Sequence, residues 1–253
     1  MEPSDNAGDK ITSKPSFFNP TTILALLIIV AQVLISAGTY PFLPPVVPSH
    51  FDISGQVNGY LPKLVNAILI PGISVVLFLI LRFAVQIGPN LGYQNQRRAN
   101  AQVVNLILVG ILLFMLVIQL LTTAYALGAK VDISLIVCLA VSVLFMFLGN
   151  YLGKLRRNFW AGIRTPWTLA SDIVWERTHR LGGWLFVAVG FVGLITSFFP
   201  PLRFIGLFVP LIVVILILVV YSYIAYQRYT VEGKEPLSPP FNGRDDVPDR
   251  VDE

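Results

Sequence analysis

Six long apolar blocks constrain this chain more than any other feature of its sequence. They cover residues 21–38, 64–81, 103–127, 131–148, 181–199 and 204–226. At about 1.5 Å of rise per helical residue, each block is long enough, or nearly so, to cross a hydrocarbon core about 30 Å thick. No block carries a charged residue or a histidine well inside it. Since a charge at the centre of an inserted helix costs roughly 2.5 to 3.5 kcal/mol, the blocks predict an all-α, polytopic integral membrane protein with six transmembrane helices.

The composition agrees with this fold class. Hydrophobic residues make up 55% of the 253 residues and charged residues 13%, with a mean hydropathy of +0.72. A soluble domain of this length could not bury so much apolar surface. The first block has a rival interpretation as a cleaved signal peptide, because Ser36, Ala37 and Gly38 resemble a processing site. The length of the block and the polar segment before it favour a retained helix.

The basic residues predict the orientation of the chain. Of its 18 lysines and arginines, only Lys63, Lys130 and Arg203 fall on one side of the predicted topology. All others fall on the side that also holds both termini. Cytoplasmic loops accumulate lysine and arginine, so we expect both termini in the cytoplasm and a multi-pass protein of the cell membrane. This topology also accounts for the basic pI near 9.3, and no direct contact with nucleic acid is expected.

Four regions follow from these features. Residues 1–20 and 231–253 are polar and rich in Pro, Gly and Asp, and they are predicted to be disordered cytoplasmic tails. Residues 21–100 form an N-terminal membrane domain with two helices and an outer loop, and residues 101–230 a second membrane domain with four helices and an inner loop. The single cysteine, Cys138, excludes an intramolecular disulfide and suggests no metal cluster. No cofactor is predicted.

The outer loop, YPFLPPVVPSHFDISGQVNGYLPK, joins the first two helices over residues 40–63. Its five prolines argue against a continuous helix or a central strand, and such a stiffened loop suits a recognition surface. His50 and Asp52 flank Phe51 and could bind a metal ion or act as a pH switch. Two potential ligands are few for a metal site, so we prefer a turn with a solvent-facing imidazole. The candidate recognition residues are Pro44, Pro48, His50, Phe51, Gly55, Gly59, Tyr60 and Lys63.

The inner loop, residues 149–186, contains all four tryptophans and six basic residues. This mixture of aromatic rings and positive charge predicts a segment that lies along the inner membrane surface. Pro166 favours an extended Thr165, and Ser171 or Asp172 can cap a helix that runs into the fifth block. Arg164 is expected to stack on Trp160 or Trp167, or to bind carbonyl groups.

A charged helix face follows in the same loop. Asp172, Glu176, His179 and Arg180 lie three or four residues apart, so they share one face. Such a face could bind a metal or relay protons. A solvated start of a helix with ion pairs such as Glu176 to Arg180 explains the pattern more simply.

A family resemblance rests on these two loops. The run GNYLGKLRRNFWAGIRTPWTLASDIVWERTHRLGGWLFVAVG resembles the signature of the SdpI-type immunity protein family, with its N-x-x-x-G-I-R-T-P-W-T and W-x-x-T-H-R motifs. The outer loop, with P-S-H-F-D and N-G-Y-L-P-K, resembles the N-terminal domain of unknown function that often accompanies that family. Both motifs are long and specific, and together they cover most of the chain from Tyr40 through the fifth helix.

The resemblance implies resistance to a secreted toxic peptide and sequestration of a small transcriptional autorepressor at the membrane. Because the two loops are predicted on opposite sides of the membrane, the outer loop would bind the peptide and the inner loop would bind the repressor. The residues assigned to the inner partner surface are Asn158, Gly162, Arg164, Thr165, Pro166, Trp167, Thr168, Trp175, His179 and Arg180.

Two other classes of function remain. A transporter or channel for a small solute fits the membrane architecture, but ion pathways usually contain ionisable residues. The predicted helices offer mainly Gln32, Ser36, Asn105, Gln119, Thr122, Thr123 and Ser142, which suit interhelical hydrogen bonds. An enzyme is not expected, because no catalytic motif appears and the two histidines are predicted on opposite sides of the bilayer.

Overall fold

The computed structural model of the chain describes residues 19–87, 97–158 and 161–231, and this part is mostly helical. Six of its helices are long and apolar enough to span a membrane, which confirms the predicted number. They are α1 (Pro20–Thr39), α2 (Lys63–Ile87), α3 (Arg97–Ala126), α4 (Ile133–Leu152), α6 (Asp172–Thr196) and α7 (Ile205–Tyr226). The predicted tails fall almost wholly outside the described residues, and Trp160 falls outside them too.

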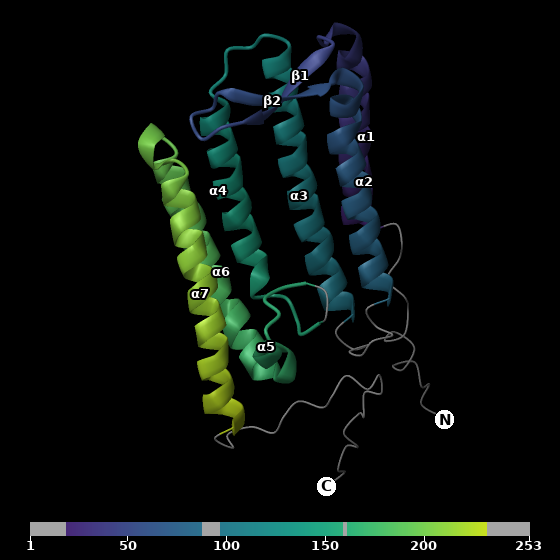
Figure 1. Cartoon of the computed structure of the whole chain (residues 1–253). Coiled ribbons are helices and arrows are strands. Elements are labelled where there is room, and N and C mark those ends of the chain that lie inside the picture. Colours follow the sequence, from purple (N-terminus) through teal and green to yellow (C-terminus); the bar gives the residue numbers. More distant parts are fainter. Residues whose placement is uncertain (1–18, 88–96, 159–160, 232–253) are drawn as a thin grey trace, which may run out of the picture.

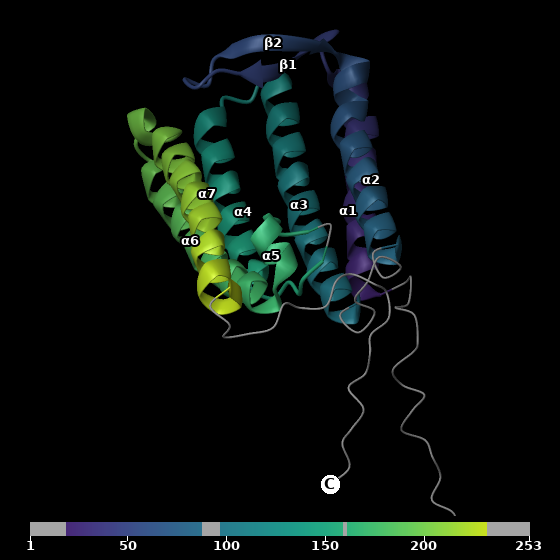
Figure 2. The same cartoon turned by 60° about the horizontal axis from the view of Figure 1, so that its bottom comes forward.

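The six helices form two groups of three (Figures 1 and 2). In the first group α1, α2 and α3 enclose a core that includes Ala25, Phe78 and Leu112. In the second group α6 packs between α4 and α7, and its contact with α4 is the most extensive in the molecule. Helix α3 packs against α4 and so joins the two groups.

Small residues bring α4 and α6 close together. A Cβ atom added at Gly149 would lie 2.6 Å from the carbonyl oxygen of Gly183, and one at Gly183 would lie 2.7 Å from that of Gly149. Further along, a Cβ atom at Gly190 would lie 2.5 Å from the Ser142 carbonyl. Helices in lipid associate largely through such close packing, because burial of apolar surface drives them little.

Polar side chains join the first three helices, as predicted. The Gln119 amide of α3 donates to the Gln32 carbonyl oxygen at 2.8 Å and to Ser36 Oγ at 2.9 Å, both on α1. Ser36 Oγ in turn donates to the Ala67 carbonyl of α2 at 2.8 Å.

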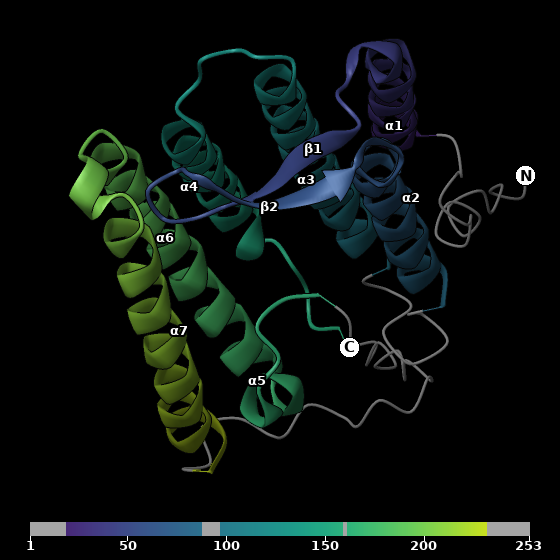
Figure 3. The ribbon, with the colours of Figure 1, turned by 45° about the horizontal axis from the view of Figure 1, so that its top comes forward.

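The outer loop contains a β-hairpin that the all-α prediction did not include. Strand β1 (Val46–Phe51) pairs with β2 (Val57–Pro62) in an antiparallel ladder with register shifts around His50. Pro48 is accommodated because a two-stranded sheet has only edge strands. The hairpin crosses above the ends of α3 and α4 (Figure 3). Its Val47 is fully buried, and the Phe51 ring meets the Tyr125 ring of α3 edge to face at 5.2 Å.

The hairpin and the inner loop lie at opposite ends of the bundle (Figure 1). The hairpin end also holds the connections after α3 and α6, where Arg203 binds Asp132 at 2.9 Å. The inner end holds a loop after α4, the short helix α5 (Pro166–Ala170) and the start of α6. Helix α6 begins at Asp172, nine residues before the apolar block that predicted it, so the second half of the inner loop is helical.

Candidate functional site

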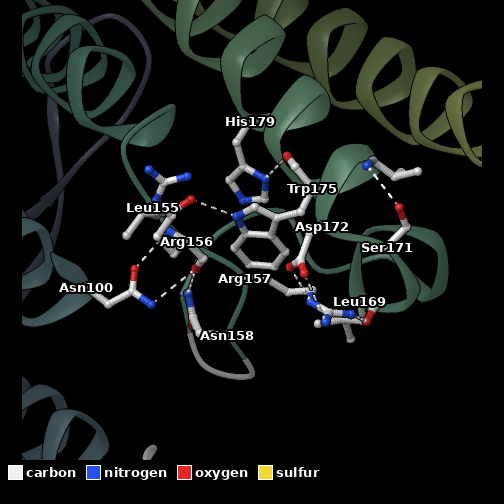
Figure 4. A network of polar contacts seen from close by, with 11 residues as sticks. Asn100, Leu155, Arg156, Arg157, Asn158, Leu169, Ser171, Asp172, Trp175 and His179 are labelled. Carbon is white, nitrogen blue, oxygen red and sulfur yellow. Dashed lines mark hydrogen bonds and ion pairs between the residues drawn. The ribbon is translucent and has the colours of Figure 1, made fainter. Parts of the chain in front are cut away.

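A stacked pair of aromatic rings lies at the centre of the inner end. Trp175 and His179, one turn apart on α6, stack with ring centroids 3.9 Å apart and an angle of 18°. Both side chains are buried, and Trp175 Nε1 donates to the Leu155 carbonyl at 2.7 Å (Figure 4). This bond fastens α6 to the loop that follows α4.

Backbone groups bind both nitrogens of His179. Its Nδ1 lies 2.9 Å from the Trp175 carbonyl, which can only accept, so Nδ1 carries the proton. Its Nε2 accepts from the Ile163 N–H at 2.9 Å. The imidazole is therefore neutral, with its tautomer set by these two bonds. The expectation of a solvated helix start is wrong for this residue, because its relative exposure is 0%.

Gly162 makes the contact with His179 possible. Its φ angle of +111° is one that side chains rarely adopt, and a Cβ atom there would lie 2.3 Å from His179 Nε2. A glycine at this position lets the backbone approach the imidazole edge. The glycine and the histidine of the two sequence motifs thus belong to one structural unit.

The threonines on either side of Pro-Trp fold the next turn. Thr165 is extended, as Pro166 predicted, and it forms a capping box with Thr168 at the start of α5. Thr168 Oγ1 also donates to the Ile163 carbonyl at 2.8 Å, and Thr165 Oγ1 bonds Ser222 of α7 at 3.1 Å. The Trp167 ring meets the Tyr223 ring of α7 at 5.1 Å. These contacts attach α5 to the last helix.

An ion pair closes the opposite side of the loop. Arg157 is buried, and its Nε lies 2.7 Å from the carboxylate of Asp172, while its Nη1 donates to the Leu169 carbonyl at 2.9 Å. Burial lowers the pKa of Arg157, although the charge of Asp172 opposes the shift. Asp172 thus pairs with the loop that precedes its helix. Its neighbour Ser171 caps α6, as predicted.

A residue of α3 binds the same loop. Asn100 donates to the Arg156 carbonyl at 3.2 Å and accepts from the Arg156 N–H at 2.8 Å (Figure 4). Asn158 folds the loop after it, because its amide donates to that carbonyl at 2.8 Å and its oxygen accepts from the Ala161 N–H at 2.7 Å. Sequence reasoning missed Asn100 and Arg157. The position of Arg157 just before the N-x-x-x-G-I-R-T-P-W-T motif was the one available signal.

The predicted inner residues therefore separate into three groups by their exposure and contacts. Six serve the internal structure of the loop through a close approach, a capping bond or a buried contact: Asn158, Gly162, Thr165, Thr168, Trp175 and His179. Trp167 is half-buried against α7. Arg164, Pro166 and Arg180 are exposed and form the accessible part of the motif.

The four tryptophans predicted a loop that lies along the membrane surface, but the structure buries part of the loop in the protein. Trp175 is in the protein core and Trp167 packs on α7, so among the described tryptophans Trp184, at 74% exposure, is the one that faces outward. A cavity of about 440 Å³ opens beside the loop, with Lys154, Arg156 and Glu176 among its lining residues.

The candidate residues of the outer hairpin also differ in exposure. Pro44, His50 and Tyr60 are exposed, and Tyr60 has 60% of its surface open. His50 faces Asn58 across the hairpin, and a Cβ atom at Gly59 would lie 2.8 Å from His50 Cβ. Lys63 is half-buried, with its ammonium group 4.7 Å from the centre of the Tyr40 ring.

The hairpin turn is built on Asp52. Its Oδ1 accepts from the Ser54 hydroxyl at 2.6 Å and from the N–H groups of Ser54 and Gln56. These bonds, that from the Ser54 hydroxyl above all, hold the pKa of Asp52 below its ordinary value. Gly55, with φ of +83°, completes the turn and rests on Ser134 of α4. Asp52 and His50 therefore serve separate hydrogen bonds.

Comparison with known proteins matches both loops. The model of the SdpI/YfhL protein family matches residues 154–225, from the inner loop through α7. A domain of unknown function, DUF1648, matches residues 27–75, which include most of α1, the hairpin and half of α2. Immunity protein SdpI of Bacillus subtilis (strain 168) is 26% identical over 209 residues, which are 82% of this chain and 94% of that protein.

No solved structure matches the chain. The matched ranges lie inside the predicted regions 21–100 and 101–230, whose own boundaries remain predictions. Two family models, a relative aligned over most of both chains and six membrane-length helices agree with the resemblance seen in the two loops. The chain is thus a multi-pass cell membrane protein that is similar to the SdpI/YfhL protein family over residues 154–225 and to Immunity protein SdpI over most of its length.

Proposed function

We propose that the chain is an SdpI-type immunity protein that protects its cell from a secreted toxic peptide and, with that peptide bound, holds a small transcriptional repressor at the membrane. The name of the similar Immunity protein SdpI supports the first part. The second part rests on the separation of two candidate surfaces by the length of the bundle (Figure 1).

The outward face of the hairpin is the proposed docking surface for the peptide. Tyr60 and Val46 are exposed on this face, and Ile53 at the turn has 77% of its surface open. Exposed aromatic and aliphatic side chains on a stiff backbone suit recognition of an apolar peptide, since little conformational entropy is lost on binding.

Helix α3 supplies the observation that carries the proposal. Near one end its Tyr125 contacts Phe51 of the hairpin. Near the other end its Asn100 side chain forms two hydrogen bonds with the backbone of Arg156. A single rigid helix therefore contacts both candidate surfaces. A peptide that favours one tilt of α3 over another would shift the inner loop, in proportion to its difference in affinity for the two states.

The proposed repressor surface comprises the exposed Arg164 and Pro166, together with the cavity beside Arg156. Lys154 and Arg156 oppose Glu176 across that cavity, so it offers both signs of charge to a partner protein. This surface has no catalytic task in the proposal. The buried His179, whose two nitrogens both bind backbone groups, serves the fold.

The experiment separates resistance from signalling. Cells that express Tyr60→Ser, Arg164→Ala or Trp167→Ala would be challenged with a secreted toxic peptide against which the wild-type protein gives resistance. Membrane retention of a repressor that the wild-type protein holds in the presence of that peptide would be measured in parallel. Tyr60→Ser should lower both resistance and peptide-dependent retention. The two inner variants should lose retention while resistance persists, and Lys130→Ala, exposed at the outer end, should change neither.

If the two inner variants, at normal protein abundance, lost resistance as much as they lost retention of the repressor, separate outer and inner roles would be refuted. Sidedness is tested separately with an impermeant thiol reagent on His50→Cys and Arg164→Cys. The native Cys138 is buried and should give little background. Labelling of both positions from one side of the membrane would refute the receptor model.

The transporter alternative receives less support. Gln119 and Ser36, two of the polar side chains expected between the helices, bind one another and backbone carbonyls of α1 and α2, which is a structural use for them. Solute uptake by the reconstituted protein would favour transport over the immunity proposal.

A further inference from the structure

A second cavity at the inner end lies between α6 and α7. Its volume is about 430 Å³, and its lining combines Arg177, Arg180 and Glu176 with Trp184 and Tyr221. The cavity shares Glu176 with the cavity beside Arg156 and Arg180 with the predicted partner residues, but its wall toward α7 has no part in the function proposed above.

Arg177, Arg180 and Trp184 share one side of α6. They are spaced by three and four residues, so their side chains follow one another along the helix. Trp184, with 74% of its surface exposed, stands on the bundle exterior, where the amphipathic indole ring favours the boundary between headgroups and hydrocarbon. The two arginines lie closer to the helix start, at the level expected for lipid phosphates.

Helix α7 supplies the facing wall. Tyr221 lines the cavity, and the Tyr229 ring lies 4.3 Å below the Arg177 guanidinium. This cation–π contact orients Arg177 without neutralising its charge. Within the described part of the chain, neither Arg177 nor Arg180 forms an ion pair. Two arginines and one glutamate leave the cavity with an excess of positive charge.

We propose that this cavity binds the headgroup of an anionic phospholipid, such as phosphatidylglycerol, from the leaflet at the inner end. The guanidinium groups would hold the phosphate through paired N–H donors, and the acyl chains would run along the exposed side of α6 past Trp184. Basic pockets between membrane helices bind anionic headgroups in this manner. The lipid would brace α6 and α7 at the end where α5 is attached.

Native mass spectrometry of the full-length protein, released into detergent with equal amounts of phosphatidylglycerol and phosphatidylcholine, tests the proposal. Wild type should retain phosphatidylglycerol preferentially. Arg177→Gln and Arg180→Gln should each lower that preference by about fivefold, the usual effect of one basic residue near a membrane surface. Arg180→Lys keeps the charge and should retain most of the preference.

Arg156→Gln is the matched control, because it removes an equal charge from an exposed site at the same end but outside this cavity. It should bind lipid as wild type does. Equal retention of the two lipids by wild type would overturn the proposal. An equal loss of preference in Arg156→Gln would also overturn it, because general attraction to a basic end would then explain the binding. Inorganic phosphate should not displace the lipid, and displacement would identify a site for free phosphate instead.

Discussion

Replacement of Gly162 by alanine should destabilise the inner loop more than any other glycine-to-alanine replacement in that loop. The backbone at φ +111° is strained for a residue with a side chain, at a cost of about 1 to 3 kcal/mol. The new Cβ atom, 2.3 Å from His179 Nε2 before relaxation, would also push the imidazole off the Ile163 N–H. Loss of that buried bond adds about 1 to 3 kcal/mol. We expect a total of about 2 to 6 kcal/mol.

Two other glycines separate these costs. Gly128 has φ of +95° but open space around it, so Gly128→Ala introduces the backbone strain without a clash. Gly38 has neither feature, so Gly38→Ala should be nearly neutral. Unfolding of each purified variant would be followed by tryptophan fluorescence as a denaturing detergent is titrated into mild micelles. If Gly162→Ala were no less stable than Gly128→Ala, the argument from the imidazole contact would be refuted.

Three further predictions use the same unfolding assay. Asp172→Asn should cost on the order of 3 kcal/mol because it removes the negative charge that faces the buried guanidinium of Arg157, whereas Arg157→Met should cost less because the carboxylate is half exposed; equal costs would contradict this. Gly183→Ala should force α4 and α6 apart and lower the yield of folded protein, while Gly72→Ala, with its nearest contact at 3.9 Å, should not. Asp132→Asn should remove a stabilisation that the wild-type protein has at neutral pH and loses as the pH falls below about 4. If the stability of wild type and variant fell in parallel with decreasing pH, the pair with Arg203 would not be the cause.

The sign of the acid effect follows from the surroundings of Asp132. Partial burial raises its pKa most, but the Leu135 N–H and the Arg203 guanidinium together outweigh burial and hold the pKa below its ordinary value. A carboxyl group with a lowered pKa in the folded state stabilises that state at neutral pH. This contribution disappears as the group is protonated.

The helices could be predicted from the sequence because their lengths are dictated by the thickness of a bilayer. The polar start of α6 carries no hydropathy signal and was predicted from its cap, Ser171 or Asp172, as the structure has it. The ion pair from Asp172 to Arg157, which stabilises the same turn, was not predicted. The hairpin was missed for a different reason. Prolines argued against strands, yet Pro48 lies on an edge, where the missing N–H costs little.

The candidate site was found by its motif, but the tasks of its residues were not. Nothing in the residue types distinguishes an exposed Arg180 from the buried His179 one position before it. The difference arises because the loop that precedes α5 presents Ile163 and Gly162 to one side of α6. Such contacts between distant segments are set by tertiary packing, so they become visible only in the folded structure.

The position of the hairpin also implies an order of assembly. The hairpin is synthesised before α3 and α4 exist, yet it rests on Tyr125 and Ser134, which leave the ribosome several seconds later at the usual pace of translation. Until then Phe51 lacks the Tyr125 ring against which it packs. The newly made chain therefore passes through an interval in which its outer strands are exposed to other proteins, and completion of the fourth helix ends that interval.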